Sequence, residues 1–243
     1  MTELHRVLSH SSFVTALIGP DRPPERELSF PYGGSPDKVC LVKAASTSSH
    51  DGFREIKKPI FGPKDSSVQD IFADGVILEE PGQTAVMWTG DCLATALYES
   101  RSGRVAVLHC GRAALSPKVT WRGKDKIENI ITMGYRNLTR GVSFPEVSAH
   151  LVGSICGHHF THEDRIGKEM IKPFWNHFGD VAFSDKKRGG INLVAIVKHQ
   201  LIGLGVEPEN IVHDGVCTFD TPTFASYRRD RSPARNAVMV FLR

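Results

Sequence analysis

Short apolar runs recur along the chain and are separated by segments rich in turn-forming residues. Runs of this length that lack polar alternation are typical of β-strands covered on both faces. Pro and Gly are concentrated in residues 19–36 and 57–69, which we expect to be loops. The pattern predicts strands at residues 39–42, 75–78, 84–89, 92–99, 104–110, 148–155, 210–215 and 237–242.

Apolar residues at helical spacing predict three helices, at residues 124–138, 163–178 and 191–203. The sequence from Thr161 to Asp164 resembles an N-terminal capping box, and Pro173 is expected to kink or shorten the second helix. Strands lead along the chain, and helices then alternate with strands. This order predicts one α+β domain that spans residues 1–243 and is built on a substantial sheet core.

The composition of the 243-residue chain is that of a globular protein, with 40% hydrophobic and 23% charged residues. A disordered, collagen-like or disulfide-stapled chain is therefore excluded. The net charge of +3 is too small to indicate a nucleic-acid partner. The excess charge is local, because residues 226–243 contain five arginines and one acid. Such a cluster indicates an anion site, although a solvated chain end would have the same composition.

The five cysteines are spaced irregularly and form no Cys-x-x-Cys motif, which indicates free thiols in a reducing compartment. We interpret Cys40, Cys110 and Cys156 as core thiols. The first residues lack the basic and apolar segments of a signal peptide. The longest apolar runs are about 6 residues, whereas a membrane span needs about 20. We therefore expect a cytoplasmic, soluble protein.

Cys92 and His109 are the best local candidates for chemistry. They are 17 residues apart, each at an end of a predicted strand, and residues 100–103 between them resemble a hairpin turn. Paired antiparallel strands would bring the two side chains together. A thiolate and an imidazole at one point could bind zinc or act as a nucleophile and its base. Alternatively, both are core residues or satisfied polar residues.

A second candidate site lies near the C-terminus, where Cys217-Thr218 is followed by residues 224–230 and then by Arg235. The adjacent Arg228 and Arg229 could fork onto a phosphate or a carboxylate. Asp230 could equally hold one of these arginines in an internal ion pair.

Three histidines precede the second predicted helix: His158, His159 and His162. They could supply a metal ligand or a base. Because the sequence shows no partners that would complete a metal set, we interpret them as a polar loop that caps the helix.

Five motifs follow one another along the chain: Gly90-Asp91-Cys92, Leu108 to Gly111, Val152 to Gly157, Gly215 to Thr218, and Ser226 to Asp230 with Arg235. In this order they resemble the laccase-domain family, also called the YfiH-type or multicopper-polyphenol-oxidase-like family. Its members are described as purine nucleoside phosphorylases. The resemblance covers roughly residues 70–243, and residues 1–70 are the divergent part.

The resemblance implies a layered sandwich of mixed β-sheets flanked by helices, an architecture shared with cytotoxic necrotizing toxins, which use a Cys–His pair. It also implies zinc-dependent phosphorolysis of adenosine, inosine, guanosine and methylthioadenosine, with adenosine deaminase as a side activity. Purine nucleosides and inorganic phosphate would then be the partners of a monomer or weak homodimer. We expect no nucleic-acid partner and no membrane association.

The site implied by the resemblance is a His–Cys–His centre that holds one zinc ion per chain and leaves a fourth position open. Cys92 and His109 match two of its ligands, and His50 is the candidate for the third. Asp91 would support this centre, and Arg228 or Arg229 would hold an anion. The residues implied to bind substrate are Arg229, Ser226, Tyr227, Arg112 and Cys217.

One segment departs from the family pattern, in which His109 would begin His-Ala-Gly-Trp-Arg-Gly. Arg112 occupies the Trp position, and the Arg that should follow is absent. Arg112 is a candidate for replacing that arginine. The departures leave two alternatives open. The chain could be a binding or interaction protein that has lost catalysis, or a metal-free hydrolase with Cys92 as nucleophile and His109 as base.

Overall fold

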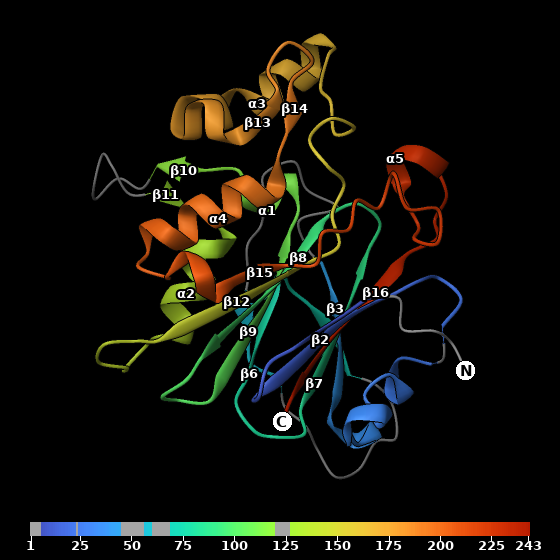
Figure 1. Cartoon of the computed structure of the whole chain (residues 1–243), viewed down its shortest axis with the longest axis vertical. Helices are drawn as coiled ribbons and strands as arrows, with labels where there is room; N and C mark the ends of the chain where they lie inside the picture. Colours follow the sequence, from blue (N-terminus) through green and yellow to red (C-terminus); the bar gives the residue numbers. More distant parts are fainter. Residues whose placement is uncertain (1–5, 23, 45–55, 60–68, 120–126) are drawn as a thin grey trace.

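The structure is a computed structural model that describes residues 6–22, 24–44, 56–59, 69–119 and 127–243. These residues form two six-stranded sheets that pack against each other (Figure 1). The strand order of the first sheet is β1 (Arg6–Ser9), β2 (Phe13–Ile18), β16 (Asn236–Leu242), β7 (Thr84–Thr89), β3 (Val39–Lys43) and β5 (Gln69–Phe72). The order of the second is β15 (Ile211–His213), β12 (Val147–Val152), β8 (Leu93–Glu99), β9 (Arg104–Cys110), β6 (Gly75–Leu78) and β4 (Ile56–Lys57).

Both sheets are mixed. Most neighbouring strands are antiparallel, but β3 runs parallel to β5 and β7, β12 to β15, and β4 to β6. Apolar side chains from both sheets meet in one layer that includes Phe13, Leu17, Met87 and Val107. Each sheet is also covered on its outer face, which explains why the strands read as unbroken apolar runs.

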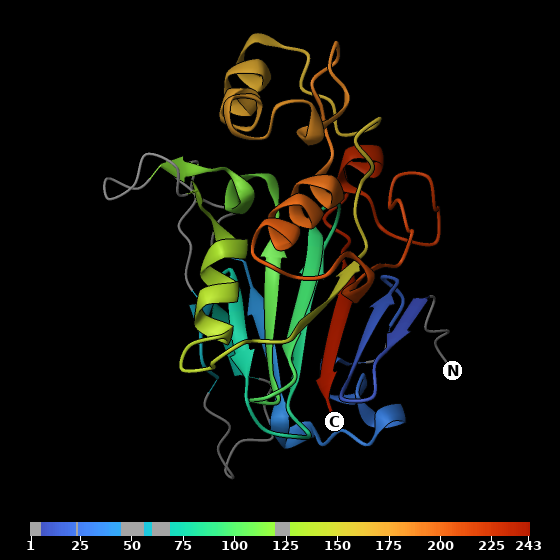
Figure 2. The same cartoon turned by 60° about the vertical axis from the view of Figure 1, so that its left-hand side comes forward.

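The helices are α1 (Arg112–Leu115), α2 (Ile130–Leu138), α3 (Arg165–Phe178), α4 (Leu193–Gly203) and α5 (Tyr227–Asp230). Helices α1, α2 and α4 pack on the outer face of the second sheet, whereas α3 lies beyond the end of the sheets (Figure 2). Buried apolar residues of α3 join the same core cluster. The outer face of the first sheet packs against Leu28 and Tyr32. These two residues belong to a segment of short 3₁₀ helices, η1 (Glu25–Glu27), η2 (Phe30–Tyr32) and η3 (Pro36–Lys38).

Shorter elements complete the chain. The strand pair β10 (Lys118–Val119) and β11 (Ile127–Glu128) precedes α2. The 3₁₀ helix η5 (Gly179–Ala182) and the pair β13 (Phe183–Asp185) and β14 (Gly190–Ile191) follow α3, and η6 (Pro208–Asn210) precedes β15. Figure 1 shows α3, the β13–β14 pair and α5 beyond the same end of the two sheets. That end carries the candidate site.

The α+β sandwich of mixed sheets with flanking helices is confirmed. Each of the eight predicted strands corresponds to an observed strand, with ends that differ by up to three residues. The pattern missed the other eight strands of the described residues, which are β1, β2, β4, β5, β10, β11, β13 and β14, although the six residues of β2 are all buried. No helix among the described residues is long and apolar enough to cross a membrane.

Two helix predictions were wrong in detail. The first helix begins only at Ile130, because Asn129 caps it by accepting hydrogen bonds from the backbone of Ile131 and Thr132. Of the predicted residues before it, 124–126 lie outside the described residues, and 127–128 form β11.

The second helix is capped by Asp164, whose side chain accepts a hydrogen bond of 2.7 Å from the Gly167 backbone, so the predicted capping box from Thr161 is wrong. The helix also passes through Pro173 to Phe178. A proline removes one helical hydrogen bond, and burial of Phe174 and Phe178 in the core offsets that loss.

Candidate functional site

The hairpin of β8 and β9 brings Cys92 and His109 together, as the spacing predicted. His109 pairs with Ala94 and Cys110 with Leu93, which places Cys92 opposite Gly111. A Cβ atom on Gly111 would lie 3.0 Å from the Cys92 sulfur and 2.9 Å from Cε1 of His109. Both side chains therefore crowd the same face of Gly111, and glycine leaves the room that they occupy.

Asp74 supports the His109 ring from behind. Nδ1 of His109 lies 3.8 Å from Oδ1 of Asp74, and both side chains are almost fully buried. The backbone carbonyl of Asp74 accepts a hydrogen bond of 2.8 Å from the His109 backbone. Burial alone would lower the pKa of His109, but the charges of Cys92 and Asp74 outweigh it and raise that pKa to about 10. Sequence reasoning missed Asp74, which precedes β6.

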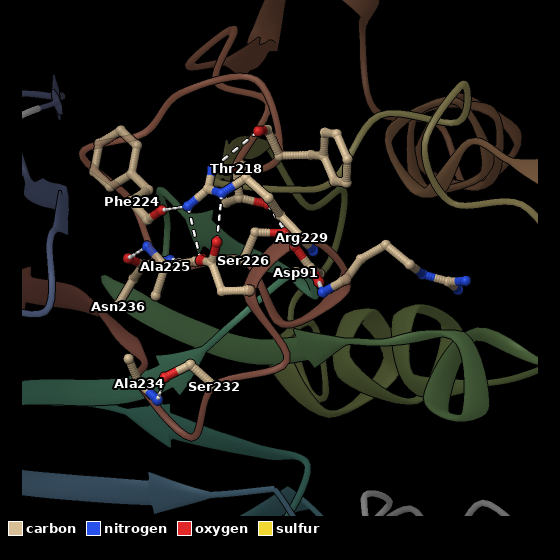
Figure 3. A network of polar contacts seen from close by, with 12 residues as sticks. Asp91, Thr218, Phe224, Ala225, Ser226, Arg229, Ser232, Ala234 and Asn236 are labelled. Carbon is tan, nitrogen blue, oxygen red and sulfur yellow. Dashed lines mark hydrogen bonds and ion pairs between the residues drawn. The ribbon is translucent and has the colours of Figure 1, made fainter.

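Asp91, just before β8, forms hydrogen bonds with the C-terminal segment. Its carboxylate accepts hydrogen bonds from the hydroxyls of Thr218 (2.9 Å) and Ser226 (2.7 Å) and from the backbone of Arg228 (2.6 Å) (Figure 3). Gly90 lies next to α5, since a Cβ there would be in van der Waals contact with Cβ of Tyr227, at 3.4 Å. Asp91 therefore positions α5 beside Cys92.

The structure distinguishes the two adjacent arginines. Arg229 donates to the backbone carbonyls of Thr218, Phe219 and Phe224 at 2.8–2.9 Å and pairs with Asp230. Its guanidinium therefore holds the loop together (Figure 3). Internal pairing with Asp230, which the sequence left open, is present.

Arg228 has a different environment. Among the described residues its side chain makes no hydrogen bond or ion pair, and its guanidinium lies 5.3 Å from the centre of the Phe160 ring. The charge of Arg228 contributes to the lowered pKa values of both Arg112 and His162, so these three side chains lie close together. Arg228 is thus available to a ligand.

Arg112 begins α1, directly after Gly111. Burial lowers its pKa, the charge of Cys92 acts in the opposite direction, and Arg228 lowers it further. His162 is buried, with Nδ1 3.2 Å from the carbonyl oxygen of Gly189. Burial lowers the pKa of His162 to about 4, and the charges of Arg112 and Arg228 add to the shift. Two arginines and a neutral histidine are therefore near enough to influence one another's charge, and this combination of groups suits an anion.

Other predicted site residues have structural contacts. The Ser226 side chain caps α5 and donates to Asp91. Tyr227 is half exposed, and the guanidinium groups of Arg231 and Arg235 lie 5.8 and 5.6 Å from the centre of its ring. Cys217 lies apart from the Cys92 site, in a second cluster described below, and His50 lies outside the described residues.

A second group of ligand-type side chains, which we call the loop cluster, consists of Cys156, His159, Cys217 and Asp220. One ligand atom from each lies within 4.8 Å of the others. Burial raises the pKa of Cys217 to about 11. The core-thiol interpretation of Cys156 is therefore wrong, because its half-buried sulfur belongs to this cluster. That interpretation is confirmed for Cys40 and Cys110, where burial raises each pKa to about 12.

The three histidines lie in the loop before α3, as predicted, but Asp164, and none of the histidines, caps the helix. His159 belongs to the loop cluster, and His162 faces Arg112 and Arg228. A signal for the loop cluster was present in the sequence, since Cys156-x-x-His159 and Cys217-x-x-Asp220 share one spacing.

The donors at the Cys92 site suit zinc. Sulfur and imidazole nitrogen are zinc ligands, and a carboxylate behind the imidazole is the usual support of a zinc-bound histidine. Cys92, His109 and Asp74 supply these three groups. The described residues thus fit two ligands of the implied centre and one supporting group.

Comparisons with known proteins found a matching family model and relatives in sequence. The model of the family described as multi-copper polyphenol oxidoreductase laccase matches residues 60–243. A Campylobacter jejuni protein named purine nucleoside phosphorylase is 29% identical over 204 residues, which cover 80% of this chain and 82% of that protein. A Mycobacterium bovis protein with the same name is 26% identical over 180 residues, or 74% of this chain and 65% of that protein.

Solved structures share the fold. YlmD from Geobacillus stearothermophilus superposes with a TM-score of 0.73 at 16% identity and covers 100% of this chain and 98% of its own. YfiH from Bacillus licheniformis gives a TM-score of 0.72 at 16% identity, with 95% and 93% covered.

Proposed function

We propose that this chain, which belongs to the multi-copper polyphenol oxidoreductase laccase family, is a purine nucleoside phosphorylase. The observation that carries the proposal is the convergence of an anion position, formed by Arg112 and Arg228, with the Cys92–His109 pair. Relatives that carry this name support the same activity. Adenosine, inosine, guanosine and methylthioadenosine are the proposed substrates, with adenosine deamination as a side activity.

The proposed reaction transfers the sugar to phosphate. The C–N bond between purine and ribose breaks, a phosphate oxygen bonds to the same sugar carbon, and the purine takes the bonding electron pair and a proton. Phosphate must therefore be held beside the sugar in a fixed orientation, since positioning contributes a large part of the rate enhancement.

Arg112 and Arg228 hold the phosphate in this scheme. Guanidinium groups bind phosphate through paired hydrogen bonds, and these bonds strengthen where water is excluded. His162 stays neutral at pH 7 because its pKa is about 4. In this scheme a ring nitrogen of His162 can therefore share a hydrogen bond with the phosphate without adding a positive charge. Phe160 lies under the Arg228 guanidinium and limits its movement.

Cys92 and His109 would hold one zinc ion, with His50 as the proposed third ligand, and the metal would act there as a Lewis acid toward a substrate oxygen or a water. Asp74 orients the His109 ring, and Asp91 holds α5 so that Arg228 stays over the site. The family name does not lead us to propose oxidase chemistry, because a multicopper oxidase needs several His-rich ligand sets. The one group of three or more ligand-type residues among the described residues contains a single histidine.

A direct test incubates the purified chain with each of the four nucleosides, with and without inorganic phosphate. We expect free purine and a sugar phosphate in equal amounts, only when phosphate is present. The Cys92→Ala variant should be inactive and should lack the zinc of this site, whereas Cys40→Ala, which removes a thiol from the core, should retain both. Normal turnover by Cys92→Ala would refute the assignment.

A metal-free hydrolase is the second candidate, favoured by one observation. Asp74, His109 and Cys92 follow one another in the order of an acid–base–nucleophile triad, and the raised pKa of His109 favours its protonated form. This candidate predicts that a chelator leaves activity intact and that alkylation of Cys92 in metal-free protein abolishes it. Nucleoside binding without turnover would instead support a protein that has lost catalysis.

A further inference from the structure

The loop cluster joins two tight turns that lie 61 residues apart in sequence. In the first, the backbone N–H of His159 donates to the carbonyl of Cys156 at 3.1 Å. In the second, the N–H of Thr221 donates to the carbonyl of Cys217 at 3.0 Å. An isolated bridge between Ser154 and Cys217 holds the two turns side by side. Each turn therefore presents two ligand-type side chains toward the other.

The separations among Cys156, His159 and Asp220 are close to those around a tetrahedral zinc ion, and the ligand atoms of all four residues lie within 4.8 Å of one another. The Cys156 sulfur lies 3.2 Å from Nδ1 of His159 and 3.8 Å from Oδ2 of Asp220. Nδ1 of His159 lies 3.4 Å from Oδ1 of Asp220. Zinc bonds of about 2.3 Å to sulfur and about 2.0–2.1 Å to nitrogen or oxygen give tetrahedral edges of about 3.3–3.8 Å.

The surroundings of the cluster also suit a metal thiolate. The Cys217 sulfur accepts hydrogen bonds from the backbone N–H groups of Cys156, at 3.2 Å, and of Asp220. Hydrogen bonds to ligand sulfurs stabilise their negative charge. The His159 ring stacks on Phe219 with centroids 4.1 Å apart, so its orientation is fixed with Nδ1 toward the cluster.

We propose that the loop cluster binds one zinc ion through all four of its side chains, as a structural site separate from the Cys92 site. Two sulfurs, one imidazole and one carboxylate form a closed tetrahedral set, which leaves no open position for a substrate. Binding displaces the thiol protons of Cys156 and Cys217 to solvent and involves no oxidation.

The expected effect of this zinc is to position the anion site. The turn of Cys156 leads directly to Phe160 and His162, which contact or face Arg228. The turn of Cys217 contains Thr218. The Thr218 hydroxyl donates a hydrogen bond to Asp91, and the Thr218 carbonyl accepts one from Arg229. The metal would therefore fix the two loops that carry opposite sides of the proposed phosphate position.

The test measures zinc per chain in full-length protein that is kept reduced and equilibrated with zinc. In the Cys92→Ala variant the first site is disabled, and we expect about one zinc per chain to remain, because the folded loops still present all four ligands of the second site. Adding Cys156→Ser and Cys217→Ser should remove it, whereas adding Cys40→Ala should not. Cobalt in place of zinc should give a thiolate-to-metal absorption band in Cys92→Ala that the double serine variant loses.

A second variant is a control for loss of zinc through misfolding. Asp220→Asn alters an exposed ligand and leaves both cysteines in place. It should weaken zinc binding at least about tenfold while the far-ultraviolet circular dichroism is unchanged.

The inference is overturned if Cys92→Ala binds no zinc, or if its zinc survives loss of both loop cysteines. If wild-type zinc is lost only on Cys92→Ala, the loop proposal fails while the proposed function stands. If it is lost only with the loop cysteines, the loop proposal stands and the metal part of the proposed function fails.

Discussion

The Cys92 site and the loop cluster each combine cysteine with histidine, but they are built in different ways. Cys92 and His109 come from adjacent strands of one hairpin, so the strand register fixes their relation. The loop cluster comes from two turns 61 residues apart, and its geometry depends on how the loops pack. The Cys92 site has arginines beside it, whereas the loop cluster is a closed set of four ligands. The first arrangement suits chemistry, and the second suits a cross-link.

The largest expected effect separates the two sites by function. Cys92→Ala removes a ligand beside the anion position and should lower kcat/KM at least about a hundredfold, because metal polarisation contributes several kcal/mol. Cys217→Ala should instead lower the melting temperature measured in the presence of zinc and reduce activity only a few-fold. Steady-state kinetics and thermal unfolding of both variants check this. If both variants lost the same fraction of kcat/KM and had the same melting temperature, the two sites would not differ in function.

The two adjacent arginines sharpen the same comparison within one short helix. Arg228→Ala should lower kcat/KM for phosphate about a hundredfold at nearly unchanged stability, since one charge-stabilising donor contributes about 2.7–4 kcal/mol. Arg229→Ala should destabilise the fold by about 2–3 kcal/mol, because three carbonyls lose a charged donor. Phosphate titration of the rate and urea unfolding measure the two effects. The opposite pattern would show that the arginine roles are exchanged.

The Gly111→Ala substitution tests how closely the side chains of the Cys92 site are packed. Its backbone angles, φ −76° and ψ 166°, are ordinary for any residue, so alanine meets only the side chains of Cys92 and His109. Gly111→Ala should lower activity about tenfold, since displacements of about 1 Å are costly at reacting groups. Gly203→Ala is the matched control, because nothing lies within 4 Å of its added Cβ. Unchanged kinetics in both variants would place the two side chains farther apart than the structure does.

The smallest effect concerns acid stability. Burial holds the pKa of His162, and that of His150 in the sheet core, at about 4, below the usual unfolded value of about 6.5. The unfolded chain therefore binds more protons between these values, so stability is present above pH 6.5 and is lost as the pH falls toward 4.

Replacing His162 with Gln should remove roughly 2 kcal/mol of this acid-induced loss. Urea unfolding at pH 7 and pH 5 measures the change, with His150→Gln as a second buried histidine far from the arginines. A pH dependence of stability identical to that of the wild type in both variants would contradict the depressed pKa values.

Local patterns predicted eight of the sixteen strands of the described residues. They also predicted the Cys92–His109 pair, because a hairpin register follows from short-range sequence. The apolar run of β2 carried the same signal as the strands that were predicted, so its omission was avoidable. The choice between Arg228 and Arg229 was beyond the sequence, because it depends on which guanidinium reaches the carbonyls of Thr218, Phe219 and Phe224.

Long-range contacts were also beyond the sequence. Asp74 reaches His109 across neighbouring strands, and the loop cluster joins turns whose proximity comes from tertiary packing. The repeated Cys-x-x-His and Cys-x-x-Asp spacing could suggest two half-sites, but only the fold shows that they face each other.

Phosphorolysis is tested by the initial rate of nucleoside cleavage as a function of phosphate concentration, with purine and ribose phosphate both quantified. We expect the rate to saturate with phosphate, one sugar phosphate to form for each purine released, and the rate of Arg228→Ala to respond much less to phosphate. Cleavage to free ribose at a rate independent of phosphate would contradict the proposed phosphorolysis.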